Sequence, residues 1–387
     1  MALQIEGGRV LLGDELVETD LVLDGSVIAG IGEGGAARRM DAAGLLVLPG
    51  IVDLHGDAFE RQIQPRPGVG FPMEIALRDT GTQLLASGIT TAFHAVTLSW
   101  EPGLRSADTW SAVLDGIAAL PPGGCDQRVH MRWELHNLAA LDLALADIEA
   151  GRVQLLSFND HTPSILRKLG TPSGAAKYAD RAMMAVDAFR ALAEAAHARD
   201  AEVPGAVARL AAAARRAGLP MASHDDDTLA TRARFRALGA GICEFPMAED
   251  VGIEAAAAGE AVVMGCPNVV RGGSHLGWAS AATLAERGVS SVLVSDYFYP
   301  AMAQAALILG RGPLGLARAW ALVSGNPARA ARLHDRGRIA PGLRADLVLL
   351  EERTGAVVAT LVGGQVAHMT AAGWARVTMP GLAAAPA

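Results

Sequence analysis

A histidine and an aspartate stand two positions apart directly after the first long apolar stretch of the chain. This stretch, residues 48–54, contains a Pro-Gly turn signal near its start and leads to His55 and Asp57. Side chains two positions apart in a β-strand point to the same face, so this imidazole and this carboxylate would face the same way. A strand that is apolar along its length and polar at its carboxyl end is typical of a parallel barrel, whose strand ends face a catalytic pocket. Two solvated polar residues would give the same pattern, so the pair alone does not decide between a site and a surface.

The same kinds of side chain recur at the carboxyl ends of the strands that follow. Seven of the ten histidines lie at or just past a predicted strand end, and carboxylates accompany them. In chain order these residues are His55, Asp57, His94, His130, Glu134, His136, Asp160, His161, His224, Glu244, Asn268, Arg271, His275 and Asp296. Imidazoles and carboxylates that converge in one pocket are nitrogen and oxygen ligands suited to zinc or manganese. The pattern therefore predicts a metal site.

Several of these residues also have simpler interpretations. Glu134 is hard to explain by packing, because a buried carboxylate without a cation is costly. The aspartates that follow His224 would equally suit the first turn of a helix. Asp160 and His161 fit either metal ligation or substrate contact. Three histidines, taken singly, are better explained by packing or by support of a neighbouring ligand: His94, His130 and His136.

Strand and helix patterns alternate through the middle of the chain and would position these side chains. Eight strand–helix repeats over about 280 residues favour a closed (β/α)8 barrel over an open doubly wound sheet. Neither a GxGxxG that opens a helix nor a GxxxxGK[ST] occurs, so nucleotide-binding sheet folds lose support. After the first strand, the predicted strands are 89–95, 128–135, 153–158, 220–223, 241–245, 261–264 and 290–295, and a long helical insert, 163–217, follows the fourth strand.

Both ends of the chain have short apolar runs separated by turn signals, which are typical of strands. We expect the two ends to pair into a small β-sandwich domain formed by residues 1–48 and 338–387, with residues 49–337 forming the barrel.

Composition bounds the class of protein. The net charge of −8 argues against a nucleic-acid partner, because nucleic acid is itself negatively charged. No uncharged apolar run reaches the length of about 20 residues that a membrane span needs, and no signal-peptide pattern occurs at the start. The three cysteines are widely spaced, as expected of free thiols in a reducing compartment. We therefore expect a cytoplasmic protein without a membrane or nucleic-acid partner.

Several longer motifs resemble the amidohydrolase superfamily. These are His55-Gly56-Asp57 after an apolar strand, Asp296 on the eighth strand, Gly325-Asn326-Pro327-Ala328-Arg329, and residues 337–348. The resemblance implies a (β/α)8 barrel with one or two divalent metal ions and a β-sandwich built from both chain ends. The usual motif on the first strand of that superfamily is His-x-His, and Asp57 departs from it. Motifs at 65–67, 159–163, 223–226 and 267–275 are similar to a narrower group, the diphosphatases of the carbon–phosphorus lyase pathway, which act on a ribosyl phosphonate triphosphate.

The resemblance implies roles for individual residues. Zinc, or alternatively manganese, would be held by His55, Asp57, Glu134, Asp160, His224 and Asp296, with His161 as the alternative to Asp160. Catalysis would fall to Asp296 as general base, with His161 and His275. A small phosphorylated sugar would be bound by Arg271, Arg66, Asn268 and Ser274, and Lys168 and Lys177 would reach in from the insert.

Two other functions fit the same pattern less well. The same metal centre could hydrolyse a C–N bond, as in a cyclic amide, an acylated amine or a deaminase substrate. A non-catalytic barrel used as a binding scaffold is the third possibility, and the full set of strand-end ligands argues against it. A homo-oligomer is compatible with the superfamily, although no sequence stripe marks an interface.

Overall fold

The computed structural model describes residues 2–32, 34–273 and 280–378. Two predicted site residues, Ser274 and His275, lie outside the described residues, as does the end of the predicted terminal domain, residues 379–387.

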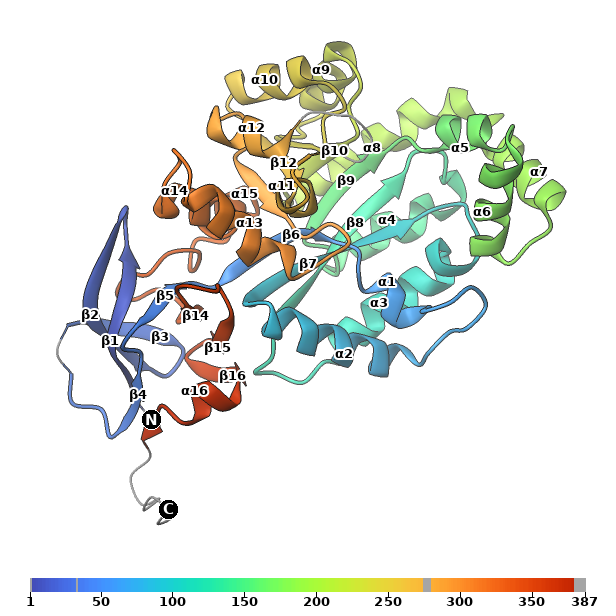
Figure 1. The fold of residues 1–387 in the computed structure, drawn as a ribbon. Helices are drawn as coiled ribbons and strands as arrows, with labels where there is room; N and C mark the ends of the chain where they lie inside the picture. The colour runs from blue at the N-terminus through green and yellow to red at the C-terminus, as the bar shows by residue number, and fades with distance from the viewer. Residues whose placement is uncertain (1, 33, 274–279, 379–387) are drawn as a thin grey trace.

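Eight parallel strands form a nearly closed barrel, which confirms the predicted fold (Figure 1). Their order in the sheet is the order in the chain. The strands are β6 (Ile51–Gly56), β7 (Ile89–Leu98), β8 (Asp126–Glu134), β9 (Leu155–Asn159), β10 (Met221–His224), β11 (Ile242–Glu244), β12 (Ala261–Gly265) and β13 (Val292–Val294). Parallel neighbours need crossover connections, and helices supply them here.

The barrel closes where β6 meets the segment after β13. The backbone N–H of Asp296 donates to the carbonyl of His55 at 2.9 Å, and that of Asp57 donates to the carbonyl of Asp296 at 2.9 Å. Below this point the buried Asp53 carboxylate accepts hydrogen bonds from Ser295, at 3.0 Å from N and 2.5 Å from Oγ. Closure therefore brings the first and the last strand ends together.

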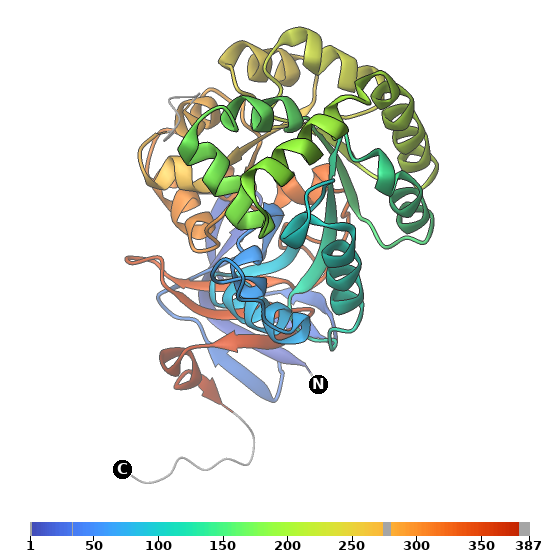
Figure 2. The same ribbon diagram turned by 90° about the vertical axis from the view of Figure 1, so that its right-hand side faces the viewer.

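Helices cover the outside of the barrel (Figure 2). Several begin at a residue whose hydroxyl accepts a hydrogen bond from the first turn: Ser106 does so for α3, Thr228 for α9 and Ser280 for α12. The covering helices are α2 (Met73–Ala86), α3 (Ala107–Ala118), α4 (Leu141–Glu149), α8 (Val203–Arg216), α9 (Leu229–Ala237), α10 (Glu249–Ala257), α12 (Ala281–Glu286) and α13 (Ala301–Gly310). Shorter helices are α1 (Glu60–Ile63), α11 (Cys266–Val270), α14 (Leu316–Ala321), α15 (Gly325–Ala330) and α16 (Ala371–Trp374).

The barrel interior has an apolar lower part. Buried side chains from most of the strands form one cluster there, with α15 contributing Ala328: Val52, Leu54, Phe93, Leu155, Ala222, Ile242, Val263, Val292 and Val294. This packing leaves the polar residues to the upper part of the barrel, at the carboxyl ends of the strands.

The predicted helical insert is present and has a core of its own. It contains α5 (Thr162–Lys168), α6 (Pro172–Ala182) and α7 (Val186–His197), which bury Ile165, Leu169, Tyr178 and Phe189 against one another. In Figure 1 these helices lie at the end of the molecule that is distant from the terminal sheet.

Both chain ends contribute to a second, mostly antiparallel sheet of nine strands, as predicted. Strand β5 of the N-terminal part pairs with β14 of the C-terminal part. The strands are β1 (Leu3–Leu12), β2 (Glu15–Asp24), β3 (Val27–Ile31), β4 (Arg38–Asp41), β5 (Leu45–Pro49), β14 (Leu347–Glu351), β15 (Val357–Val362), β16 (Gln365–Met369) and β17 (Val377–Thr378). Gly50 joins this sheet to the barrel, and a Cβ there would lie 2.3 Å from Thr90 Oγ1. The domain boundaries after residues 48 and 337 stay predictions.

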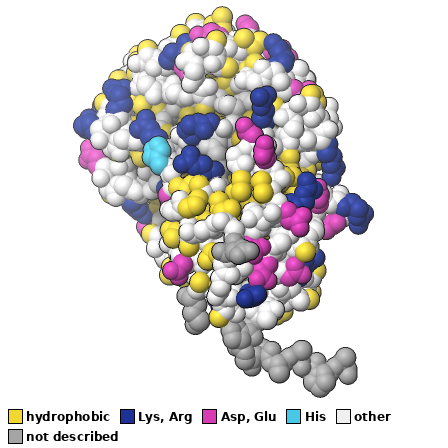
Figure 3. Space-filling model, turned by 90° about the vertical axis from the view of Figure 1, so that its left-hand side faces the viewer, with side chains coloured by type: hydrophobic (Ala, Val, Ile, Leu, Met, Phe, Trp, Pro, Cys, Tyr) yellow, Lys and Arg dark blue, Asp and Glu magenta, His cyan; other side chains and the backbone are white. Residues whose placement is uncertain are grey.

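The surface carries hydrophobic side chains on one side of the molecule. Figure 3 shows them gathered in a band, with Lys and Arg side chains above it. Partly exposed apolar residues of the terminal sheet include Val17, Val27 and Ile31. The oligomeric state stays a prediction. Among the helices in the described part of the chain, none has the length and apolar character needed to cross a membrane.

Arg232 on α9 is fully buried and provides a test of the packing around β10 and β11. Its guanidinium lies 3.3 Å from Asp226 Oδ2 and donates to Glu260 Oε1 at 3.2 Å. Arg232→Ala would leave both carboxylates without this cation, so we expect the free energy of unfolding in urea to fall by about 3–5 kcal/mol. Arg236 on the same helix is 31% exposed, and Arg236→Ala should cost about 1 kcal/mol or less. Equal losses in the two variants would contradict this account.

Candidate metal centre

Strand β8 places three chemically different side chains on the inner face of the barrel. His130, Arg132 and Glu134 alternate with Val129, Met131 and Trp133, which pack in the core beneath the helices. The alternation is the ordinary period of a strand. An imidazole, a guanidinium and a carboxylate therefore follow one another toward the carboxyl end, and each meets a different group from the neighbouring strands.

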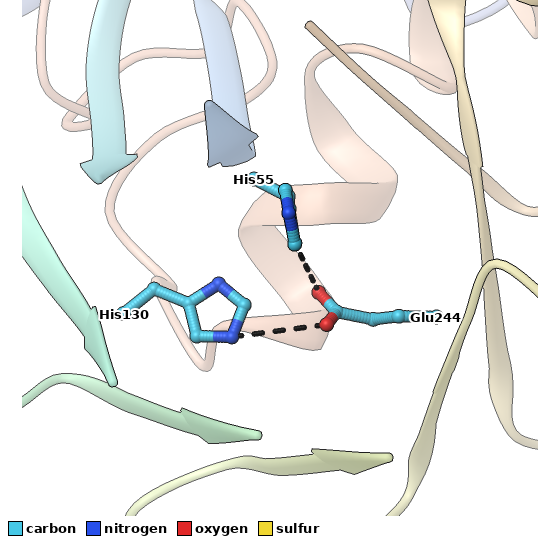
Figure 4. A group of neighbouring side chains, drawn as sticks. All are labelled: His55, His130 and Glu244. Atoms are coloured by element: carbon cyan, nitrogen blue, oxygen red, sulfur yellow. Dashed lines mark hydrogen bonds and ion pairs between the residues drawn. The ribbon is translucent and has the colours of Figure 1, made fainter. Parts of the chain in front are cut away.

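The lowest of these groups joins His55, His130 and Glu244 (Figure 4). Glu244 Oε1 lies 3.3 Å from His55 Nδ1, and Oε2 lies 3.8 Å from His130 Nε2. All three side chains are buried, and their ligand atoms lie within 4.8 Å of one another. Two imidazoles and a carboxylate at this spacing are a ligand set for a divalent metal ion such as zinc.

The state of these side chains fits such an ion. His130 Nε2 is buried and has no hydrogen-bond partner among the described residues. The other ring nitrogen, Nδ1, contacts the carbonyl of Leu54 at 3.0 Å, which fixes the ring orientation. Burial lowers the pKa of His130 to about 4, and burial together with the charge of Arg132 holds the pKa of His55 well below its usual value. Both imidazoles are thus neutral at pH 7, as metal ligation requires.

A second group, His161, His224 and Asp225, lies closer to the surface. His224 Nε2 is 3.6 Å from Asp225 Oδ1, and His161 Nε2 is 3.8 Å from Asp225 Oδ2. His224 also links the two groups, because its Nδ1 lies 3.4 Å from Glu244 Oε2 and its ring stacks on that of His55 at 5.2 Å.

Arg132 lies against this second group. Its Nη2 is 3.2 Å from His224 Nε2, and its Nη1 is 3.8 Å from Asp57 Oδ2. Burial, with this positive charge as the next cause, holds the pKa of His224 well below its usual value.

Asp57 and Asp296 meet at the closure of the barrel. Burial, followed by the charge of Glu60, raises the pKa of Asp57 to about 6. Burial, followed by the charge of Asp57, raises the pKa of Asp296 to about 7. Asp225, Phe245 and Asp296 all have left-handed backbone conformations, with φ of 58°, 52° and 56°. Left-handed residues other than glycine are uncommon and cluster at functional sites.

The Glu134 carboxylate is fixed mainly by hydrogen bonds from residues at the start of α5. It accepts hydrogen bonds from Thr162 Oγ1 at 2.7 Å, from Thr162 N at 3.1 Å and from His161 N at 3.2 Å. Burial alone would raise its pKa, but the nearby imidazoles of His136 and His161 and the hydrogen bonds from Thr162 outweigh burial and lower the pKa to about 2. Asp160 is half exposed, and its Oδ1 lies 3.7 Å from His136 Nδ1. Glu134, His136 and Asp160 form a further candidate ligand group.

The predicted phosphate-binding residues lie on loops and helices around these groups. Arg271 follows α11, is exposed, and its Nη1 donates to the hydroxyl of Tyr297 at 3.4 Å, one residue after Asp296. Asn268 Oδ1 accepts from the backbone N–H of Ala281 at 3.0 Å. Arg66 is exposed on the loop after α1, and Lys168 and Lys177 are exposed on the insert.

The structure thus brings His55, Asp57, His161, His224 and Asp296 to one end of the barrel. It adds four residues that the sequence analysis did not assign as metal ligands, catalytic groups or substrate contacts: His130, Arg132, Asp225 and Glu244. The period of two along residues 128–135 is the signal that could have placed His130 and Arg132 on the face of Glu134.

Replacing Glu244 tests the lower ligand group. Glu244→Gln keeps the shape of the side chain but removes the charge that faces three imidazoles. Loss of an outer partner of a metal ligand costs about 10–100-fold in affinity, so we expect a loss of about 100-fold or more for zinc. Metal content after dialysis, measured by mass spectrometry, would check this. Glu249→Gln on α10, whose side chain is 49% exposed and pairs with Arg287, is the matched control. Full occupancy in Glu244→Gln would contradict ligation by Glu244.

Comparisons with known proteins agree with this architecture. The model of the amidohydrolase family matches residues 176–367. The alpha-D-ribose 1-methylphosphonate 5-triphosphate diphosphatase of Escherichia coli (strain K12) is 32% identical over 366 residues, which cover 90% of this chain and 95% of that protein. The adenine deaminase of Methylobacterium nodulans is 28% identical over 98% of this chain and 61% of its own length. A solved beta-aspartyl dipeptidase from Fervidobacterium islandicum shares the fold, with a TM-score of 0.64 at 15% identity over 96% of this chain and 99% of that one. With its eight-stranded barrel, its sheet from both chain ends and these relatives, the chain belongs to the amidohydrolase family and is a hydrolase.

Proposed function

We propose that the protein hydrolyses alpha-D-ribose 1-methylphosphonate 5-triphosphate to the 5-phosphate and diphosphate. The observation that carries this proposal is the 32% identity that extends over 95% of the Escherichia coli diphosphatase. The small phosphorylated sugar would enter at the carboxyl end of the barrel, between the insert and the loop that carries Arg271.

His55, His130 and Glu244 are the residues best arranged to hold a divalent metal ion, with His224 beside them. When bound, the ion would supply a Lewis acid that activates water and neutralises charge on phosphate oxygens. The imidazoles of His55 and His130 and the carboxylate of Glu244 would hold it.

Asp296 would accept the proton of the attacking water. Its pKa of about 7 is near the value at which a carboxylate is both available as a base and strong enough to deprotonate water. Water would attack one phosphorus of the α–β anhydride, Asp296 would take the proton, and the bridging P–O bond would break to release diphosphate.

His161 would give a proton to the leaving diphosphate. Burial alone would lower its pKa, but the neighbouring carboxylates of Asp225 and Glu134 outweigh burial and raise it. An imidazolium here would also neutralise negative charge. Arg271 would contact an outer phosphate. It donates a hydrogen bond to the hydroxyl of Tyr297, the residue that follows Asp296 in the sequence.

Hydrolysis of a C–N bond is the second candidate. The similarity to an adenine deaminase over 98% of this chain favours it. The same ligand groups and the same base would serve attack on a carbon centre, because the activated water is common to both reactions.

Phosphorus NMR distinguishes the two reactions. Metal-loaded protein would be incubated with the ribosyl methylphosphonate triphosphate and, separately, with ATP. We expect diphosphate to appear from the first substrate, because the relative of this name matches nearly the whole chain. ATP should remain intact if specificity lies in the pocket. Turnover of neither compound by metal-loaded protein would contradict the proposed reaction, and release of ammonia from adenine would support the second candidate.

Arg271→Ala tests the contact with phosphate. A hydrogen bond from a charged donor is worth about 1.5–3 kcal/mol, so we expect kcat/KM for the triphosphate to fall by about ten- to a hundredfold. Arg287→Ala is the control, because Arg287 is 48% exposed and pairs with Glu249 on α10. An unchanged kcat/KM in Arg271→Ala would exclude Arg271 from phosphate binding.

A further inference from the structure

Arg132 is a buried cation in the middle of the candidate centre, and the roles described so far leave it unexplained. Arg132 is 6% exposed and lies between His130 and Glu134 on the inner face of β8. A buried guanidinium carries a large desolvation penalty, which only good partners offset.

Protein groups satisfy only part of the hydrogen-bonding capacity of the Arg132 guanidinium. Nη2 is 3.2 Å from the neutral ring nitrogen His224 Nε2, and the nearest carboxylate oxygen, of Asp57, is 3.8 Å from Nη1. Its Nε is buried without a hydrogen-bond partner among the described residues. Arg232 differs in its carboxylates, because its guanidinium lies 2.9 Å from Glu260 and 3.3 Å from Asp226. Arg132 therefore has donors left for an anion.

Arg132 also blocks the second group of candidate ligands. In the group of His161, His224 and Asp225, the nitrogen of His224 that faces Asp225 is Nε2, at 3.6 Å. This is the nitrogen that Arg132 contacts. A metal ion bound there would need the lone pair that faces the guanidinium, and it would lie beside a fixed positive charge. In the buried group of His55, His130 and Glu244, the Nε2 of His130 is free of such a competitor.

We infer that Arg132 takes the place of a second metal ion. The centre then binds one divalent ion, at His55, His130 and Glu244, and the guanidinium binds a phosphate oxygen of the substrate beside it. The planar fork of arginine suits phosphate, because two parallel N–H groups meet two oxygens. The metal count stands independently of the reaction, whereas the contact with phosphate rests on the proposed function.

Metal content tests the first part. Proteins would be loaded with excess zinc, desalted and analysed by mass spectrometry together with protein concentration. Wild type should hold about one ion per chain and Arg132→Met about two, because the neutral side chain frees His224 Nε2 for ligation. Arg132→Lys should stay at one. Arg128→Met is the matched control, because Arg128 lies lower on the same strand and pairs with Asp126 at 2.9 Å.

Two ions in wild type would overturn the inference, and so would one ion in folded Arg132→Met. Circular dichroism would verify folding, and Arg132→Gln would replace a methionine variant that does not fold. The wild-type count is decisive by itself, because the inference allows one ion: Arg132 contacts the second group, and Glu134 of the further group already accepts three hydrogen bonds from the chain.

Calorimetric binding of inorganic diphosphate tests the second part without any turnover. Each protein would carry one equivalent of zinc. We expect Arg132→Met to bind diphosphate about ten- to a hundredfold more weakly than wild type, and Arg128→Met to bind it as wild type does. Equal affinity in Arg132→Met would overturn the contact with phosphate. Diphosphate binding that depends on Arg132 in a protein that fails to cleave the triphosphate would instead count against the proposed reaction alone.

Discussion

The hydrogen bonds that join β6 to the segment after β13 determine where the candidate centre can form. The backbone pairs between His55, Asp57 and Asp296 close the barrel, and the bonds from Ser295 to Asp53 support them from below. An edge strand of an open sheet is hydrogen-bonded on one side only, whereas closure gives each strand a neighbour on both sides. The same hydrogen bonds that complete the fold therefore set the spacing of the His55 imidazole and the Asp57 and Asp296 carboxylates. The left-handed conformation of Asp296 is retained because its N–H donates to His55 and its C=O accepts from Asp57.

The separation of the barrel interior into a lower apolar layer and the candidate ligands above it follows from the cost of burying polar groups. The lower part is filled with apolar side chains such as Val52, Phe93 and Ile242, which need no partners. The imidazoles and carboxylates of the candidate ligand groups lie above this layer, where each meets another polar group from a neighbouring strand. Glu244 illustrates the constraint, since it is fully buried and faces three imidazoles. A buried carboxylate in such surroundings is stable only with cations or donors around it, and this is why the candidate ligands concentrate at one level.

The sequence predicted the barrel, the insert and the terminal sheet because each rests on local patterns of period two or on helical periodicity. It also placed His55, His224 and Asp296 at strand ends, since a strand end is visible in the sequence. Which residues share a ligand group was not predictable, because His55, His130 and Glu244 come from three strands whose relative heights depend on the register of the sheet. Glu244 ends a strand of three residues, which is too short to show a period. Arg132 was overlooked because the period of two places it on the face of Glu134 but does not show which groups of the other strands it meets.

The proposed metal ion and the folded state should depend on each other. Glu244, Asp57 and Asp296 are carboxylates whose pKa burial raises, so the apo protein pays for their desolvation without full compensation. An ion that binds only the folded chain stabilises it by about 2.7 kcal/mol at a concentration 100 times its dissociation constant. Arg132 supplies part of the same compensation permanently, because a guanidinium does not dissociate. On this proposal, the chain would combine one cation that is built into β8 with one that the solution provides.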